Sequence, residues 1–450
     1  MNRKIDYLLP TLLILTMAVC SFFAIIDEAK YFLINFGIIQ EKQETSVETV
    51  EVDNTGNDNT KEEVVIEKVD FEELYPFKNE RHDYSSIETS TSIKDKYLYY
   101  LDILNYEASA FESNLMMFNK AKNLGSSFKK AIVSRAPYIS SEIEETSDHY
   151  FVRTNKKNSE DDYQSMIEAI NDLKDYLDDM SIPMLYIEVP TKISVKDEEN
   201  YISGYGYSYV NYDNQLYVDM LKDSGIELID LKDYFYDLND NYHALYYKTD
   251  HHYKVSTGYE VSKIIVEYLI NNYGLDISEE YLDENLYETI VYEDAMFGSE
   301  GQTVGNNYAS REDFEFLNPT FDTDIKLTNI DIGVDKQGSF LETILDTDKL
   351  EEYSNNNGGY AYECLIGGNR PLTTIENLNS ENDTRILILK DSYALAAAPY
   401  LSLTVDEVDL IDTRPNAGNF NGSVRTYIEN NKPDIVLLLY GSNIQTSTFD

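Results

Sequence analysis

Short apolar runs that alternate with helical patterns are the feature of this 450-residue chain that most constrains its fold. Each run is too short for a buried helix and is apolar without strict alternation, which is typical of a strand covered on both faces. The five runs are residues 183–189, 226–231, 385–389, 405–411 and 434–440, and helical patterns at 159–180, 257–273 and 423–431 lie between several of them. This order predicts an α/β fold with a mainly parallel sheet flanked by helices.

The remaining segments divide the chain into parts with different compositions. Residues 276–381 are rich in Asn, Asp, Gly and Thr, and we interpret them as a partly β insertion in a catalytic domain that spans 151–450. Residues 91–150 are expected to form a helical N-terminal extension. Residues 41–90 begin as an acidic segment poor in large apolar side chains, which indicates an extended stalk or linker.

The N-terminal 30 residues have the pattern of a membrane anchor. Arg3 and Lys4 precede an uncharged apolar stretch, residues 7–26, which is long enough to cross a bilayer as a helix. Basic residues before the span place the N-terminus in the cytoplasm. We therefore expect a single-pass protein of the cell membrane with its catalytic domain outside the cytoplasm. A cleaved signal peptide is the alternative.

Charge and cysteine content exclude several classes of protein. Lys and Arg total 36 against 82 Asp and Glu, giving a formal net charge of −46, so a nucleic-acid backbone would be repelled. An uncharged or cationic substrate fits this charge better. Cys20 lies in the anchor and Cys364 is the only other cysteine, so no disulfide is expected within the domain. Because no Cys/His cluster has the spacing of metal ligands, we expect neither a metal nor a cofactor.

Two short motifs carry the residue types of a Ser-His-Asp triad. Asp250 and His252 are two residues apart, so in an extended segment they would point the same way, with His251 facing elsewhere. Ser392 follows the apolar run 385–389 and precedes a helix-prone run of alanines, where free N–H groups at a helix start can bind an oxyanion. In this arrangement Asp250 orients His252, which serves as base for the nucleophile Ser392.

Each motif also has a simpler interpretation. Ser392 could be only the N-cap of the following helix. The Thr-Asp-His-His run could form a metal site with a further ligand, or start a capped helix. Since ligands in open α/β sheets bind at the carboxyl ends of the strands, Lys192 and Tyr440 at the ends of two runs are also candidate site residues.

The motifs resemble the DHHW family of bacterial surface proteins. The resemblance rests on Thr249-Asp250-His251-His252-Tyr253, with tyrosine in place of the family's final tryptophan, and on Lys390-Asp391-Ser392-Tyr393-Ala394. It continues through residues 189–192, 367–369, 411–414 and 438–440, and covers roughly 150 to 446. That family is similar to the SGNH-like acetyltransferases of alginate, which implies an SGNH-hydrolase-like fold.

The resemblance implies the roles of several residues. It makes Ser392 the nucleophile, His252 the base and Asp250 the residue that orients it. Tyr440 would then orient substrate or an oxyanion, or would be a buried tyrosine at a strand end. Arg414 would bind substrate or pair with Asp412. Lys192 would neutralise the site or be a solvated turn residue.

We therefore expect an O-acetyltransferase that modifies a surface polysaccharide or cell-wall glycan through an acyl-serine intermediate. The resemblance implies a multi-spanning membrane protein as the source of acetyl groups, because acetyl-CoA is cytoplasmic. A carbohydrate esterase uses the same acyl-enzyme and passes it to water. A glycan-binding or assembly protein without activity would retain the fold but form no acyl-enzyme.

Overall fold

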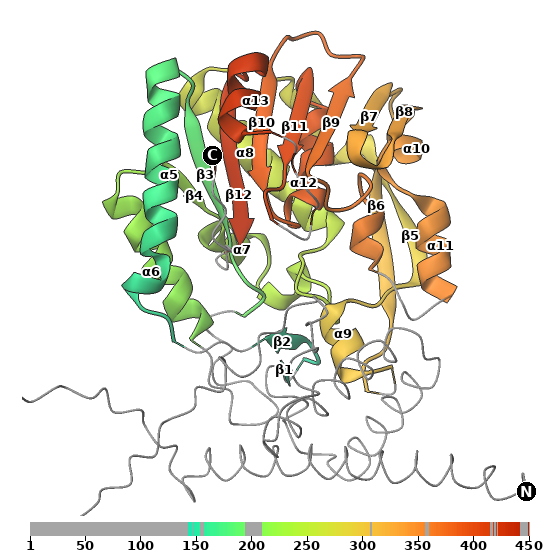
Figure 1. Ribbon diagram of the computed structural model, residues 1–450. Helices are drawn as coiled ribbons and strands as arrows, with labels where there is room; N and C mark the ends of the chain where they lie inside the picture. The colour runs from blue at the N-terminus through green and yellow to red at the C-terminus, as the bar shows by residue number, and fades with distance from the viewer. Residues whose placement is uncertain are drawn as a thin grey trace, which may run out of the picture. The chain divides into compact units, whose positions relative to one another are not determined.

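The computed structural model describes most of the chain from Ile143 onward (Figure 1). The expected membrane anchor, the stalk and nearly all of the helical extension lie outside the described residues. Among the helices that are described, none is both long and apolar enough to cross a membrane. The described residues are 143–146, 148–153, 157–193, 209–306, 308–355, 360–414, 417, 420, 422–441 and 449.

An eight-stranded sheet forms the centre of the fold, in the order β4-β3-β12-β10-β11-β9-β7-β8. Its first five strands pair in parallel. They coincide with the five apolar runs, so the predicted parallel sheet is confirmed. Their bounds are β3 Met184–Val189, β4 Leu228–Asp230, β10 Arg385–Lys390, β11 Glu407–Ile411 and β12 Ile435–Gly441.

Helices cover both faces of this sheet. Alternate residues of β12 enter two different apolar clusters, Leu437 and Leu439 on one face and Val436 and Leu438 on the other. The first cluster contains residues of α7, α8 and α12, and the second contains residues of α5, α6 and α13. Burial on both faces explains why the strands are continuously apolar. The helices are α5 Glu160–Met180, α6 Val210–Asp223, α7 Leu231–Leu238, α8 Val255–Tyr273, α12 Ala394–Ser402 and α13 Val424–Asn431.

Two small residues bring α8 and α12 unusually close together. A Cβ atom on Gly258 would lie 2.5 Å from the backbone oxygen of Ala396, so only glycine fits there. The Ser262 hydroxyl also donates to the Ala397 carbonyl oxygen at 2.7 Å. Since α8 starts three residues after His252 and α12 two residues after Ser392, this packing brings the two motifs together.

The stretch from 276 to 381 contains the expected β structure, but part of it belongs to the central sheet. Strands β7 and β9 pair antiparallel with each other, β9 pairs antiparallel with β11, and β8 completes the edge. Strands β5 and β6 form a separate antiparallel pair. The elements are β5 Tyr287–Met296, α9 Ser299–Val304, β6 Glu312–Pro319, β7 Ile325–Asn329, β8 Val334–Gly338, α10 Phe340–Ile344, α11 Thr347–Asn355 and β9 Leu372–Asn377.

A short antiparallel pair, β1 Ile143–Glu145 and β2 Phe151–Arg153, lies beside the segment that precedes α8. The Phe151 N–H donates to the carbonyl oxygen of Lys248 at 3.0 Å. In Figure 1 this pair and α9 lie below the end at which β12 finishes. Strand β1 lies at the end of the segment 91–150, for which a helical extension was expected, whereas β2 lies within the expected catalytic domain.

Candidate active site

Ser392 lies in the turn between β10 and α12 and is partly exposed. Its Oγ is 2.6 Å from His252 Nε2. The residue that caps α12 is Tyr393, and no side chain accepts a hydrogen bond at that cap. The N-cap interpretation of Ser392 is therefore not what the structure shows, because its hydroxyl contacts the imidazole instead.

His252 contacts Asp250 through its other ring nitrogen. Nδ1 makes a short hydrogen bond with Asp250 Oδ1, and the same oxygen accepts the backbone N–H of His252 at 3.0 Å. The expectation of an extended segment was wrong, because the backbone bends through these residues and the carboxylate closes a turn over two residues. The turn still aligns Asp250, His252 and Ser392 in one chain of hydrogen bonds.

Burial and charge set the protonation of this pair. Burial alone would raise the pKa of Asp250, but the imidazoles of His252 and His251 and the bound N–H groups hold that pKa well below its ordinary value. Burial, with a contribution from His251, lowers the pKa of His252 to about 4. At neutral pH the carboxylate is ionised and the imidazole neutral, which are the states that a base and its orienting residue require.

Aromatic rings enclose the His252 side chain. Tyr362 stacks on it with ring centroids 4.1 Å apart and an interplanar angle of 13°, and Tyr393 contacts it edge-on at 5.3 Å. Tyr362 comes from the segment between α11 and β9, far from either motif in sequence. Nothing in the spacing of the 39 tyrosines singled this one out.

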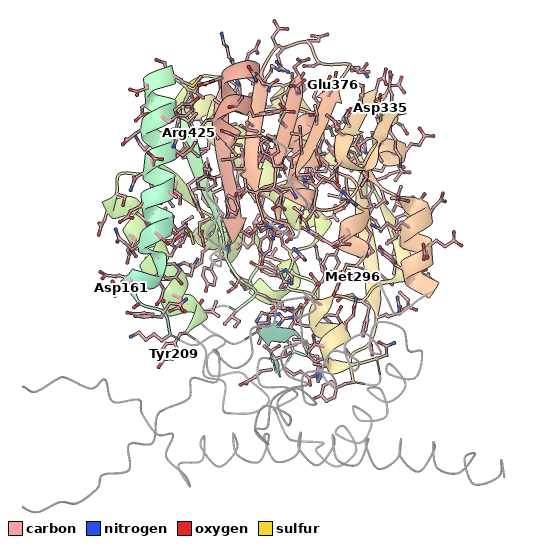
Figure 2. All side chains as sticks on the ribbon, in the orientation of Figure 1. Asp161, Tyr209, Met296, Asp335, Glu376 and Arg425 are labelled. Carbon is pink, nitrogen blue, oxygen red and sulfur yellow. The ribbon has the colours of Figure 1, made fainter. Side chains whose placement is uncertain are left out.

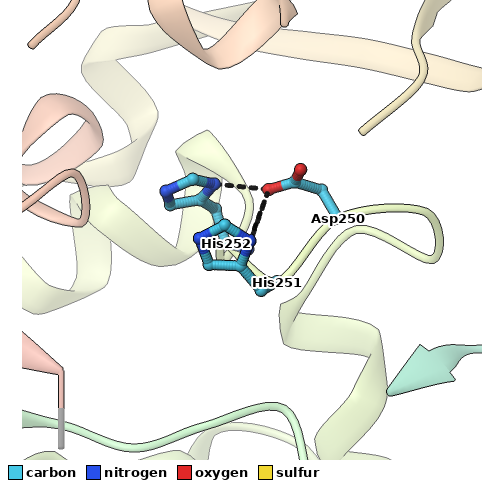
Figure 3. A group of neighbouring side chains, drawn as sticks. All are labelled: Asp250, His251 and His252. Atoms are coloured by element: carbon cyan, nitrogen blue, oxygen red, sulfur yellow. Dashed lines mark hydrogen bonds and ion pairs between the residues drawn. The ribbon is translucent and has the colours of Figure 1, made fainter. Parts of the chain in front are cut away.

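His251 does not face away from the pair, contrary to our expectation. Its ring lies against that of His252, with centroids 3.9 Å apart, and its Nδ1 is 3.8 Å from Asp250 Oδ1 (Figure 3). The bend in the backbone brings both imidazoles to one oxygen. Its Nδ1 also lies 3.1 Å from Ser299 Oγ, and 41% of the side chain is exposed.

Residues from the predicted insertion hold Asp250 in place. The Ser299 N–H donates to Asp250 Oδ2 at 2.7 Å, so both carboxylate oxygens are bound. A Cβ atom on Gly298 would lie 2.5 Å from Asp250 Cγ, so a side chain there would displace the carboxylate. Met296, labelled in Figure 2, ends β5 two residues before this glycine. The sequence offered no signal for these contacts.

Lys192 is buried beneath the Asp250 segment and supports it. Its ammonium donates to the carbonyl oxygens of Tyr247 at 3.1 Å, Lys248 at 3.3 Å and Asp250 at 2.6 Å. It also lies 3.7 Å from Oε2 of Glu300, which is fully buried. Burial lowers the pKa of Lys192 and raises that of Glu300. Lys192 is thus not a solvated turn residue, and it holds the backbone of the triad rather than contacting Ser392.

Arg414 pairs with Asp412, which is one of the two roles considered for it. Its Nε and Nη2 donate to the two carboxylate oxygens at 2.9 and 2.6 Å, and Nη2 also reaches Asn369 Oδ1 at 3.1 Å. Lys390 donates to the same Asn369 oxygen at 2.9 Å, and burial lowers its pKa to about 8. This polar cluster joins the last residue of β10, the residues that follow β11 and the segment before β9.

Tyr440 lies on the face of β12 opposite α8 and α12. It belongs to the apolar cluster that contains α5 and α13, and 1% of it is exposed. Its hydroxyl has no hydrogen-bond partner among the described residues. This position agrees with a buried tyrosine at a strand end more than with a residue that orients substrate.

Asp250, His251 and His252 also form a group whose ligand atoms lie within 4.8 Å of one another, close enough to hold a metal ion. In the geometry described here, however, both nitrogens of His252 are already engaged, Nδ1 by Asp250 and Nε2 by Ser392. This occupation of both nitrogens favours the triad over a resident metal.

Known proteins share both a sequence pattern and a fold with this chain. Residues 147–279 match the model of the SGNH hydrolase-like domain of acetyltransferase AlgX. The structure of Bacillus cereus PatB1 with a sulfonyl adduct is 20% identical, with a TM-score of 0.52 over 68% of this chain and 96% of that chain. No curated protein matches the chain significantly.

Two further solved structures have lower scores. A DHHW family protein from Eubacterium siraeum is 17% identical, with a TM-score of 0.48 over 67% of this chain and 90% of that one. The O-acetyltransferase domain of Pseudomonas putida AlgJ is 10% identical, with a TM-score of 0.41 over 69% and 95%. The AlgX match, which includes Asp250 and His252, agrees with the resemblance seen in the motifs: residues 147–279 match an SGNH hydrolase-like domain from a family of acetyltransferases.

Proposed function

We propose that this protein is an extracytoplasmic O-acetyltransferase that modifies a surface polysaccharide or cell-wall glycan through an acetyl-Ser392 intermediate. The observation that carries the proposal is the continuous hydrogen-bonded chain from Ser392 Oγ through His252 to Asp250. The acyl-transfer family of the matched domain supports the same chemistry.

The geometry supports a two-step reaction. His252 Nε2 accepts the proton of Ser392 as Oγ attacks the acetyl carbonyl, and the imidazolium then gives that proton to the departing donor group. In the second step His252 takes a proton from an acceptor hydroxyl as its oxygen attacks acetyl-Ser392, and the imidazolium then returns that proton to Ser392 Oγ as the serine is released. The ionised Asp250 stabilises the imidazolium in both steps.

The backbone also offers a group for the oxyanion of the tetrahedral intermediate. Among the described residues, the Ser392 N–H has no hydrogen-bond acceptor, and it lies just before α12. A free N–H at a helix start is suited to stabilise developing negative charge.

Aromatic side chains support a sugar acceptor and transfer over hydrolysis. The imidazole of His252 lies between Tyr362 and His251, and only 8% of His252 is exposed, which restricts water near the base. Tyr360, 38% exposed, precedes Tyr362 and offers a ring on which a sugar can stack. The net charge of −46 favours an uncharged acceptor.

The proposal includes a place in the cell and a partner. Residues 1–30 would anchor the protein in the membrane, with residues 41–90 holding the domain outside the cytoplasm. A multi-spanning membrane protein would then present the acetyl group on the outer side. No cofactor is needed within the domain, because the nucleophile and base are both side chains.

The test is the intact mass of the full chain after brief exposure to an activated acetyl ester, beside Ser392→Ala. We expect a gain of one acetyl group in the wild type only. Adding an acceptor oligosaccharide should then move the acetyl group to the sugar, whereas release as acetate alone would identify an esterase. Unchanged glycan acetylation in cells that carry only Ser392→Ala would refute the proposal.

A further inference from the structure

His251 gives the triad a second imidazole that acyl transfer does not use. Its Nδ1 lies 3.8 Å from Asp250 Oδ1 and 3.9 Å from Oε1 of the buried Glu300. The nitrogens of His251 and His252 and the Asp250 oxygen fall within 4.8 Å of one another. Figure 3 shows both imidazoles on the same side of the carboxylate.

These three groups have the chemistry of zinc ligands. Neutral imidazole and carboxylate bind Zn²⁺ at about 2.0–2.2 Å, and three protein ligands with a water complete a tetrahedral site. With 41% of its side chain exposed, His251 gives an ion arriving from solvent a first ligand.

We propose that Asp250, His251 and His252 bind Zn²⁺ reversibly and that the bound ion inhibits the enzyme. Coordination by His252 Nδ1 replaces its hydrogen bond to Asp250 and moves the ring proton to Nε2. That nitrogen then donates to Ser392 Oγ and no longer accepts the serine proton. The inhibitory part of this inference rests on the proposed function, whereas the binding part does not.

Charged groups of both signs near the three ligands determine how tightly the cluster binds Zn²⁺. Glu300 adds negative charge beside His251, while Lys192, 3.7 Å from Glu300, partly offsets it. Arg153 also pairs with Glu300, at 3.1 Å. Because only one of the direct ligands is a carboxylate, we expect Zn²⁺ to bind reversibly. A chelator present during purification should remove it.

Calorimetric titration of the full chain with zinc chloride tests the binding. We expect one ion per chain in the wild type and in Ser392→Ala, which keeps all three ligands but has no nucleophile. His251→Ala should weaken binding at least tenfold. His149→Ala, which removes a histidine that pairs with Glu145, is the matched control and should bind as the wild type does.

Hydrolysis of an activated acetyl ester, with each variant normalised to its own rate without zinc, tests the inhibition. We expect zinc to inhibit the wild type and His149→Ala, a chelator to restore their rates, and His251→Ala to need at least tenfold more zinc. Equal zinc binding by His251→Ala and the wild type, or no binding by Ser392→Ala, would overturn the proposal. Binding without any ester turnover in the wild type would instead count against the proposed function alone.

Discussion

Replacing Lys192 by Met should damage both stability and turnover, although Lys192 does not contact Ser392. The substitution keeps the length of the side chain but removes an ammonium that donates to three carbonyl oxygens of residues 247–250. It also leaves Glu300, which is fully buried, without its lysine partner. Arg153 and the imidazole of His251 then remain beside that carboxylate.

The magnitude follows from the burial of the pair. Removing one partner of a buried ion pair costs about 3–5 kcal/mol where the other charge is left uncompensated, and the remaining Arg153 pair places Lys192→Met near the lower end of that range. A shift of the Asp250 backbone by about 1 Å would lower kcat roughly 100-fold. KM for a small acetyl ester should change little, since Lys192 touches no substrate. Adding Glu300→Gln removes the stranded charge and should restore about half of the lost stability.

Urea unfolding of the full chain and ester kinetics measure the two effects. Lys174→Met is the matched control, because Lys174 and Asp178 form an exposed ion pair at 2.5 Å on α5. That variant should lose no more than about 0.5 kcal/mol and keep its kcat. If the Lys192→Met protein were as stable and as active as Lys174→Met, the positioning role of Lys192 would be refuted. The same would follow if the double variant with Glu300→Gln were no more stable than Lys192→Met alone.

Three other predictions concern the triad itself. Asp250→Asn should lower kcat about 10⁴-fold in the ester assay with little change in folding, because the amide no longer selects the Nδ1–H tautomer of His252. Gly298→Ala should lower kcat roughly 100-fold, measured in the same assay, because its Cβ would displace the Asp250 carboxylate. The pH profile of kcat/KM should fall on the acid side as pH drops through about 4, where His252 gains a proton, and a break near 6.5 would contradict the low pKa of His252.

The parallel half of the sheet could be predicted because burial on both faces leaves a strong local signal. Strand β12 is apolar from Ile435 to Leu439 and β3 is apolar except for the buried Glu188, and their ends agree with the sequence to within a few residues. Strands β7 and β9 alternate buried and half-buried residues and carry Thr, Lys, Glu and Asn. Their membership in the sheet depends on pairing with β11, which no short window of sequence contains.

The two triad motifs could be recognised in the sequence because each is local. One is a serine directly after a buried strand, and the other is an Asp-x-His turn. The residues that orient them were not visible, because they come from distant segments that meet only in the fold. Gly298 and Ser299 fix the Asp250 carboxylate, and Tyr362 fixes the plane of His252. Ser299 and Tyr362 both lie within residues 276–381, so that stretch contributes contacts to the candidate triad rather than forming a peripheral addition. Substitutions there should therefore change kcat as strongly as substitutions around Ser392, even where they contact no substrate.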